Sequence, residues 1–405
     1  MKKNEITVYF NHFNNQGILR LNEKRNMFYL NKAQYLSIAF LLKYGVEKSY
    51  GKNHTVDMMI SFLSDKGIRN INDKIFVREF NEKIPLKQIQ LEITKRCNLR
   101  CKHCYIEEYK DILDDSAIYK LIDEAAKLGV MDFDLTGGEP LFYPNIDAII
   151  EYILDRGMCT TIFSNGTILP EKIKKILKRY KGIKFRISLD GWNSETHDYI
   201  RGKGNFSKTI KTIHELEAMG VSVEINVVIN SNNIIGAEKF IKLSKELKLR
   251  FRYDKYLPFF RDNHLLVSDE DYINFLYKLP EFYSKTKNIK KYDNHGFYCG
   301  AGNSYVFVTA TGEISFCPTL SDSKFNAGNI KNDSLSNVWN HSTFFKNIRN
   351  IRCKFYNECP VSYICQGGCR SRAELSTGKI GEPDILECKL AYKISGVTPL
   401  ALKGK

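Results

Sequence analysis

The sequence contains no apolar run long enough to cross a bilayer, and its best candidate, Ile38 to Leu42, is far too short. It also lacks low-complexity tracts. The N-terminus begins with basic residues but continues with alternating polar and apolar residues instead of an apolar block, so it does not resemble a secretory signal. These absences disfavour membrane and secreted proteins, and we predict a cytoplasmic protein. Its 405 residues are too many for one small core and predict two or three domains.

Basic residues outnumber acidic ones by 61 to 46, which gives a formal net charge of +15. An excess of this sign can attract nucleic acid, an acidic peptide or an anionic surface. However, no basic run is interleaved with aromatic residues in the way that binds single strands, and the lysines are spread along expected helix faces such as Lys172 to Lys181. We therefore predict no nucleic-acid partner and no membrane partner.

Eleven cysteines are many for a cytosolic protein, in which disulfides rarely persist. Bound metal is the better explanation for them. Ten of the cysteines form two groups along the chain, which are Cys97, Cys101 and Cys104, and then Cys299, Cys317, Cys353, Cys359, Cys365, Cys369 and Cys388. Cys159 stands alone inside an apolar strand, and we predict that it is a core residue.

Residues 86–256 alternate short apolar strands with helices of 3.6-residue periodicity. The expected strands are Lys87 to Thr94, Met131 to Leu135, Thr160 to Phe163, Lys184 to Leu189, Val221 to Ile229 and Arg250 to Tyr256. The clearest helix carries Ile118, Leu121 and Ile122 on one face, after Asp115 as its cap. Six such strands predict an α/β fold whose parallel sheet curls into a partial TIM-like (β/α)6 barrel, with its site at the carboxyl ends of the strands.

Two flanking regions have different patterns. Residues 1–85 contain three alternating segments, Ile6 to Phe10, Ile18 to Leu21 and Met27 to Leu30, and then helical patterns at Lys32 to Tyr44 and His54 to Leu63. We predict a small winged-helix-like α+β module there. The central domain is expected to end at residue 285. Residues 286–405 lose helical periodicity and gain cysteines, which predicts an iron–sulfur domain that is ordered by its metal.

The first cysteine group follows the first expected strand of the barrel. Three thiolates at these spacings can hold three corners of a [4Fe–4S] cube, and no fourth cysteine is close enough in sequence to complete it. One iron would then be open to a substrate or cofactor. The alternative is a structural zinc site completed by His103, but His103 lies directly beside Cys104 and would be strained in reaching the same metal.

Small polar motifs follow the next three expected strands. Gly137-Gly138-Glu139-Pro140 allows close backbone approach, and Glu139 can accept a hydrogen bond from an ammonium group. Ser164-Asn165-Gly166 and Ser188-Leu189-Asp190-Gly191 stand at the ends of the third and fourth strands. Each motif alone is an ordinary turn. Together, four consecutive strands that end in ligand-capable groups predict one site.

This combination resembles the radical S-adenosylmethionine (SAM) superfamily across residues 86–256. The resemblance implies that SAM chelates the open iron and, after one-electron cleavage, yields a 5′-deoxyadenosyl radical that takes a hydrogen atom from the substrate. It implies cofactor-binding roles for seven residues: Gly138 and Glu139 near the amino group, Ser164 and Asn165 near the ribose, Ser188 and Arg201 facing the carboxylate, and the Tyr105 backbone near the adenine. It assigns no catalytic side chain beyond the cluster.

The C-terminal cysteines resemble the SPASM domain, which carries auxiliary iron–sulfur clusters in peptide-modifying members of that superfamily. The resemblance implies two auxiliary [4Fe–4S] clusters, the first on Cys299, Cys317 and Cys369, the second on Cys353, Cys359, Cys365 and Cys388. In the second, we predict that Cys353 replaces the cysteine that the family usually has at the position of Tyr356. In the first, Tyr305 stands where some members supply a fourth ligand, so its last iron is either open or filled by water or another residue. Zinc ribbons are the less favoured alternative.

The N-terminal module resembles, through its size and pattern, the RRE/PqqD-like peptide-recognition element that is fused to maturases of ribosomally made peptides. Such elements bind a leader peptide by adding it as a strand to a sheet edge. A structural extension packed on the barrel is the alternative. These resemblances imply a radical SAM peptide maturase that forms thioether (sulfur-to-carbon) crosslinks in a precursor peptide with a leader sequence. Its electron donor would be a reductase such as flavodoxin or ferredoxin.

Other functions remain open. Carbon–carbon crosslinking, epimerisation and formylglycine formation in sulfatases are the alternative radical modifications. Sulfatase maturation is disfavoured by the residue after Cys317. The family pattern of sulfatase-maturing enzymes has an acidic residue after the matching cysteine, whereas this chain has Pro318. A catalytically silent iron–sulfur protein is the alternative from another class. Intact Glu139, Asn165 and Arg201 disfavour it, because a silent relative need not keep a SAM pocket.

Overall fold

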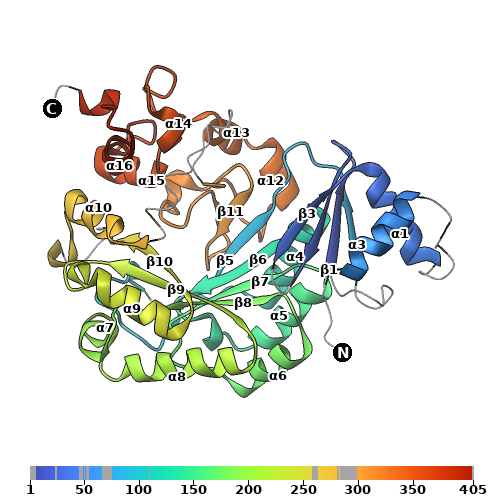
Figure 1. Ribbon diagram of the computed structural model, residues 1–405, viewed down its shortest axis with the longest axis horizontal. Coiled ribbons are helices and arrows are strands. Elements are labelled where there is room, and N and C mark those ends of the chain that lie inside the picture. The colour runs from blue at the N-terminus through green and yellow to red at the C-terminus, as the bar shows by residue number, and fades with distance from the viewer. Residues whose placement is uncertain are drawn as a thin grey trace.

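The computed structural model describes residues 6–22, 25–44, 49, 51, 54–65, 75–108, 110–257, 263–280, 282 and 299–403. Its largest sheet has eight strands in the order β10-β9-β8-β7-β6-β5-β11-β12 (Figure 1). The six expected strands are all present: β5 (Gln88–Thr94), β6 (Asp132–Gly137), β7 (Thr160–Ser164), β8 (Ile183–Ser188), β9 (Ser222–Ile229) and β10 (Arg250–Lys255). Neighbouring members of this set pair in parallel, which confirms the α/β class with a parallel sheet. The curl into a partial barrel stays a prediction.

Helices connect these strands in sequence order. They are α4 (Asp115–Lys127), α5 (Ile146–Asp155), α6 (Glu171–Arg179), α7 (Ser194–Arg201), α8 (Asn205–Ala218) and α9 (Ala237–Leu247), and α10 (Asp269–Tyr277) follows β10. The cap of α4 differs from the prediction: Asp115 is its first residue, and Asp114 is the cap, because the Asp114 side chain accepts a hydrogen bond from Ala117 N. An acceptor three residues before the orphan N–H has the reach that a cap requires.

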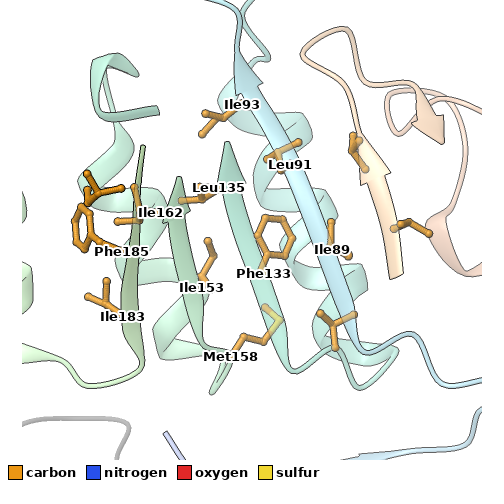
Figure 2. Packing of buried hydrophobic residues seen from close by; sticks show 14 of the residues in the cluster. Ile89, Leu91, Ile93, Phe133, Leu135, Ile153, Met158, Ile162, Ile183 and Phe185 are labelled. Atoms are coloured by element: carbon orange, nitrogen blue, oxygen red, sulfur yellow. The ribbon is translucent and has the colours of Figure 1, made fainter. Parts of the chain in front are cut away.

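The core lies between the sheet and these helices. Alternate residues of β5, namely Ile89, Leu91 and Ile93, have no exposed surface and pack with Phe133 and Leu135 of β6 (Figure 2). Full burial of each such side chain contributes about 1.5–3 kcal/mol. The opposite face of β5 carries Gln88, Gln90 and Glu92. Because the apolar face fixes the register of the strands, the positions of their carboxyl ends are fixed as well.

The N-terminal module is a second sheet, ordered β3-β2-β1-β4. Its first three strands match the expectation: β1 (Ile6–Asn11), β2 (Gln16–Leu21) and β3 (Asn26–Leu30). Helices α1 (Lys32–Tyr44) and α3 (His54–Asp65) follow. The fourth strand, β4 (Ile75–Phe80), was not predicted and pairs in parallel with β1. The winged-helix description stays a prediction.

This module is docked on the amino ends of the core strands (Figure 1). The Thr7 hydroxyl donates to the Gly157 carbonyl at 2.8 Å, just before β7. Arg20, which is 3% exposed, donates to the Met131 carbonyl at 3.0 Å and to the Asp132 carboxylate at 2.8 Å, at the start of β6. Removing one partner of such a buried ion pair leaves a charge that is uncompensated, so the pair resists separation of the two parts.

The C-terminal region is joined to the core sheet. Its strand β11 (Tyr305–Val308) pairs in parallel with β5, and β12 (Ile314–Ser315) continues the sheet in the antiparallel sense. Its helices are α12 (Leu335–His341), α13 (Thr343–Asn350), α14 (Ser362–Cys365), α15 (Arg370–Thr377) and α16 (Ile385–Ser395). The expected domain boundary at residue 285 lies outside the described residues.

Cys159 has no exposed surface and lies just before β7, as expected of a core residue. Across the part of the chain that the structure describes, no helix combines the length and the apolar composition that crossing a membrane would need.

Candidate cofactor site at the carboxyl ends of the strands

The loop after β5 carries Cys97, Cys101 and Cys104. Cys101 is buried, while Cys97 and Cys104 are half-buried. The loop is fixed to the rest of the site by backbone contacts, of which Lys102 N to Ile200 O at 3.0 Å joins it to α7. The three thiols lie near enough to affect one another electrostatically, because Cys97 and Cys104 both raise the pKa of Cys101. Burial is the larger cause and brings that pKa to about 11, although the charge of Arg201 opposes it.

Gly137 and Gly138 bring the end of β6 against the cysteine loop. Gly138 N donates to the Thr94 carbonyl at 2.8 Å. A Cβ at Gly137, whose φ is 144°, would meet that carbonyl oxygen at 2.0 Å, and one at Gly138 would meet the Arg96 carbonyl oxygen at 2.4 Å. Only glycine fits these two positions. The close approach expected at this motif is therefore made to the cysteine loop itself.

Glu139 is fully buried and joins the end of β6 to the end of β7. Its Oε2 accepts from Ser164 Oγ at 3.1 Å and from Asn165 N at 2.7 Å, and its Oε1 accepts from Leu141 N at 3.2 Å. Burial nevertheless raises the pKa of Glu139 to about 7, against these hydrogen bonds and the charge of Arg201. A cation close to this carboxylate would stabilise its ionised form and lower its pKa.

Asn165 connects the end of β7 to the cysteine loop. Its Nδ2 lies 3.8 Å from Cys97 Sγ and donates to Asn98 Oδ1 at 2.9 Å. Asn98 in turn donates to Thr167 Oγ1 at 2.9 Å. Asn98 was not singled out in the sequence, because an Asn between two cysteines has no signal of its own.

Asp190 gathers three elements at the end of β8. Its Oδ2 accepts from Arg201 Nε on α7 at 2.5 Å and lies 2.9 Å from His103 Nε2. Its Oδ1 accepts from Val228 N on β9 at 2.8 Å. Burial opposes ionisation of Asp190, but the charges of Arg201 and His103 outweigh it and hold its pKa well below the usual value. Because His103 Nε2 faces Asp190, the zinc alternative loses that ring nitrogen as a ligand.

Two predicted residues lie at the rim of this arrangement. Tyr105 follows the cysteines, and its hydroxyl lies 3.4 Å from Glu92 Oε1 on β5. Ser188 is the last residue of β8 and stands opposite Asn226 of β9. All seven predicted cofactor-binding residues are thus in, or directly after, the loops and strands that surround the cysteine loop. Their contacts to a cofactor stay predictions.

A [4Fe–4S] cube fits the donor set of this loop. Three thiols are the ligands that such a cube uses, each on a separate iron, and the cube does not need them to converge on one point. Among the residues that the structure describes, no three His, Cys, Asp or Glu side chains converge as they would around a single metal ion. The fit to a cube rests on the thiols, on their shared electrostatics and on the Arg201 cation beside Cys101.

The seven C-terminal cysteines fall into two neighbourhoods. Cys369 and Cys299 both raise the pKa of Cys317, beyond the larger effect of burial. In the second neighbourhood four cysteines line one small cavity, which are Cys353, Cys359, Cys365 and Cys388. Tyr356 lines the same cavity. This division is the one expected from the sequence, and the role of these thiols as cluster ligands stays a prediction.

Two further residues position the C-terminal cysteines. Asp384 is 3% exposed, and its Oδ2 accepts from Cys369 N at 2.7 Å and from Arg372 Nε at 2.9 Å. Tyr305 donates from its hydroxyl to Gln90 Oε1 on β5 at 2.6 Å, so its polar atom is directed to the core sheet. Sequence reasoning missed Asp384, because its partners lie twelve and fifteen positions away, in α15 and at its N-terminal end, and no local pattern links them.

Two family models match the chain. Residues 91–242 match the model described as "Radical SAM superfamily", and residues 299–369 match the SPASM model, described as "Iron-sulfur cluster-binding domain". The first covers β6 to β9, most of β5 and the cysteine loop, and the second covers the first C-terminal cysteine neighbourhood and all of the second except Cys388. Both therefore fall on regions where the geometry gathers thiols.

Relatives of this chain include proteins that are named for different functions. The antilisterial bacteriocin subtilosin biosynthesis protein AlbA of Bacillus subtilis (strain 168) is 30% identical over 296 residues, which are 69% of this chain and 66% of AlbA. The AdoMet-dependent heme synthase of Methanosarcina barkeri (strain Fusaro / DSM 804) is 29% identical over 335 residues, which are 72% of this chain and 93% of that protein.

The fold is also found in a solved structure. Streptococcus suis SuiB bound to precursor peptide SuiA superposes with a TM-score of 0.69 at 17% sequence identity, covering 94% of this chain and 98% of that one. At this identity the likeness concerns the fold. Because the coverage is nearly complete, it extends beyond the core sheet to the flanking regions.

Proposed function

We propose that this chain, an enzyme that belongs to the radical SAM superfamily and carries a SPASM domain, is a peptide maturase that installs thioether crosslinks in a ribosomally made precursor peptide. The observation that carries the proposal is the cysteine loop of Cys97, Cys101 and Cys104, surrounded by the ends of β6, β7 and β8. A relative named for bacteriocin biosynthesis and a fold shared with a precursor-peptide complex support a peptide substrate.

The cofactors of this enzyme are SAM and iron–sulfur clusters. When bound, they supply one-electron cleavage of a sulfonium bond and abstraction of a hydrogen atom from the substrate. The cysteine loop would hold the barrel-site cluster, as we call the cluster on Cys97, Cys101 and Cys104. The C-terminal neighbourhoods would hold the auxiliary clusters.

The residues around the loop would bind and orient SAM. Glu139, buried with a raised pKa, would accept from the amino group, and its contacts to Ser164 and Asn165 would hold its carboxylate in place. Gly138 would let the cofactor approach the backbone at the same position. Ser164 and Asn165 would lie near the ribose, and the Tyr105 backbone near the adenine.

The carboxylate of SAM would face Ser188 and Arg201. Arg201 is buried beside Asp190, so its guanidinium is held in one orientation before any ligand binds. A held cation binds a carboxylate with less loss of side-chain freedom than a mobile one. The same burial would exclude water from the reacting centre.

Thioether formation is proposed from the first C-terminal neighbourhood. It contains three cysteines, Cys299, Cys317 and Cys369, whereas a cube has four irons. Tyr305 directs its hydroxyl to Gln90 and not to these cysteines. A thiolate of the peptide would then ligate the fourth iron of the cluster. Forming the sulfur–carbon bond removes a hydrogen atom from carbon, which the radical derived from SAM would take, a proton from the thiol, and one electron, which the first C-terminal neighbourhood would accept on its cluster.

The N-terminal module would bind the leader of the precursor peptide. β3 is an edge strand of its sheet, and Met27 and Tyr29 on this strand are 49% and 76% exposed. An edge strand offers unpaired backbone groups to an added strand, and exposed apolar side chains favour its docking. A flavodoxin or ferredoxin is proposed as the electron donor.

A second candidate is a heme-forming reaction. The heme synthase match supports it, because this chain covers 93% of that protein, against 66% of AlbA. Both candidates need the same cysteine loop, so they differ in the substrate and not in the cofactor chemistry.

The test uses anaerobically purified full-length protein. Iron and sulfide analysis should give about twelve irons if three cubes form. With reductant and SAM, the protein should release 5′-deoxyadenosine, and Cys97→Ala should abolish this release. Cys299→Ala is the matched control, because it should spare the cleavage but block crosslinking. Absence of 5′-deoxyadenosine from protein that holds its cluster would contradict the assignment of the loop.

The substrate is tested separately. Peptides encoded beside this gene should be converted by the wild type to dehydrogenated products whose cysteines resist alkylation. A porphyrin precursor in the same assay tests the second candidate. Conversion of the porphyrin precursor, with every peptide unchanged, would reject the maturase proposal in favour of heme formation.

A further inference from the structure

The environment of Cys101 contains a buried cation that is held by a buried anion. Arg201 Nη1 lies 3.9 Å from Cys101 Sγ, within reach of an N–H to sulfur hydrogen bond. Its Nη2 lies 3.5 Å from His103 Nε2, and its Nε donates to Asp190. Arg201 is 9% exposed and Asp190 is fully buried. One guanidinium thus connects an acid after β8 to a cysteine on another loop.

Asp190 itself cannot move far. The hydrogen bond from Val228 N fixes one carboxylate oxygen, and the Asn233 side chain donates to the Asp190 carbonyl at 2.9 Å. The next residue, Gly191, packs so closely on α7 that a Cβ there would meet His197 N at 2.2 Å. The carboxylate that holds Arg201 is therefore rigid on both sides.

Stability alone is a weak reason for such a pair. Replacing a buried ion pair by apolar residues is often neutral or stabilising, because two charges must be desolvated. A held N–H donor beside a cluster sulfur does have an effect of its own. Hydrogen bonds and positive charge at the sulfurs stabilise the reduced cluster, which carries more negative charge, and so raise its reduction potential.

We propose that Asp190 is a positioning residue that holds the Arg201 guanidinium against Cys101 Sγ and thereby raises the reduction potential of the barrel-site cluster. The inference rests on the proposed cluster at Cys97, Cys101 and Cys104. Asp190 acts through Arg201 and touches neither sulfur nor cofactor in this arrangement. His103, on the second side of the same carboxylate oxygen, keeps the loop from rotating away from the guanidinium.

The direction in which Asp190→Ala changes the reduction potential of the barrel-site cluster separates this role from a simple charge effect. Asp190→Ala removes a negative charge, which by itself would raise the potential of a nearby cluster. If Asp190 acts by holding Arg201, its removal instead lets the guanidinium leave Cys101, and the potential falls. The readout is the midpoint potential of the barrel-site cluster in an EPR-monitored titration without SAM. Its signal is identified as the one absent from Cys97→Ala.

The expected result is a shift to more negative potential in Asp190→Ala, with the auxiliary signals unchanged. Asp134→Asn is the matched control, because Asp134 is also buried in the core sheet but contacts Gln88 and Thr161. It should leave the barrel-site signal at the wild-type potential. A rise, or no change, in Asp190→Ala that retains its iron would overturn the proposal.

A second variant tests whether the held guanidinium raises the reduction potential if Asp190→Ala does not fold. Arg201→Lys keeps a cation but loses the fork that spans Asp190 and Cys101. The potential should again fall, and an unchanged potential would reject the proposal. Failure of the proposed function is recognised differently, because wild-type protein would then lack the SAM-dependent cleavage whatever these variants show.

Discussion

The two cysteine-rich regions of this molecule are positioned in different ways. The loop of Cys97, Cys101 and Cys104 follows a buried strand and is held by side chains from neighbouring strand ends, such as Glu139 and Asp190. In the second C-terminal neighbourhood, Cys353 and Cys359 lie outside helices and strands, Cys365 ends the four-residue α14, and Cys388 lies on α16. The first loop takes its geometry from a sheet, and the second C-terminal neighbourhood takes it from individual contacts.

This contrast indicates which of the two regions depends on bound metal for its order. A core sheet with fully buried strands is stable through apolar burial, so the first loop is positioned before any cluster binds. Short helices such as α14, which has four residues, gain little from their own hydrogen bonds. On the proposed assignment of the C-terminal cysteines as cluster ligands, metal ligation would supply much of the stabilisation there, as in other small metal-ordered domains.

The largest expected effect follows from removal of iron. Anaerobic chelation should increase amide exchange in residues 353–388 by several orders of magnitude, because cluster binding and local order are coupled there. Exchange in β5 to β9 should stay within a few-fold of the loaded protein. Hydrogen exchange with peptide-level mass spectrometry measures both in one sample. Equal loss of protection in the core strands would remove the contrast between the two regions.

The next effect concerns Asp384, the acid that positions Cys369. Asp384→Ala should destabilise the C-terminal region by about 2–4 kcal/mol, because Cys369 N and Arg372 Nε both lose a buried acceptor at about 1–3 kcal/mol each, while Arg372 keeps its contact to Glu387. Denaturant titration and iron analysis should show loss of auxiliary iron while the barrel-site cluster remains. The exposed Asp322→Ala serves as the control and should change stability by no more than about 0.5 kcal/mol. Loss of all iron in Asp384→Ala would show that the two regions are not independent.

We expect the stability of the protein to depend on pH through His197, a buried residue of α7. Burial, with the charge of Arg201 added, lowers the pKa of His197 to about 4, and neither ring nitrogen has a hydrogen-bond partner among the described residues. Between pH 6.5 and 4 the unfolded chain binds a proton that the native chain does not, so stability falls as the pH falls through this window. The loss should approach about 3 kcal/mol.

The measurement is the free energy of unfolding against pH in His197→Phe and in wild type. The variant should have a smaller slope between pH 6.5 and 5. His214→Gln changes a histidine whose side chain is 60% exposed, and it should keep the wild-type slope. If His197→Phe also keeps that slope, His197 is not the group that weakens the core in acid.

The smallest effect concerns the polar contacts of the cysteine loop. Asn98→Ala should destabilise the protein by about 1 kcal/mol, because it removes a donor to Thr167 and an acceptor for Asn165. A double-mutant cycle with Thr167→Val should show coupling between the two positions. Additive effects would mean that sheet geometry alone orders the loop.

Much of the core could be predicted because its signals are local. Apolar alternation and helical periodicity located all six strands of the central unit, within two residues at each end. The cap of α4 was displaced by one residue, because Asp114 and Asp115 are chemically alike and only the contact to Ala117 N distinguishes them. The strand β4 was missed, since its partner β1 lies far away in sequence and no turn signal connects them.

The rest of the site depends on pairings that no local pattern reports. Nothing in residues 305–308 indicates that β11 joins β5 across more than two hundred positions. Asp190 was visible only as part of a small polar motif, because its partners His103 and Arg201 come from separate elements. Cys353, by contrast, was grouped with Cys359, Cys365 and Cys388 from the sequence because cysteine is rare enough to mark its own position, and it lines the same cavity, while its role as a ligand in place of Tyr356 stays a prediction.

The docking of the N-terminal module has a consequence for distance. Arg20 and Thr7 attach it at the amino ends of β6 and β7, whereas the cysteine loop lies at the carboxyl ends. The six residues of β6 span about 20 Å. If the module binds the leader as proposed, a peptide anchored there would need at least about six extended residues to reach the cysteines. The attachment point would then set the smallest number of residues between the anchored segment and the first residue that can be modified.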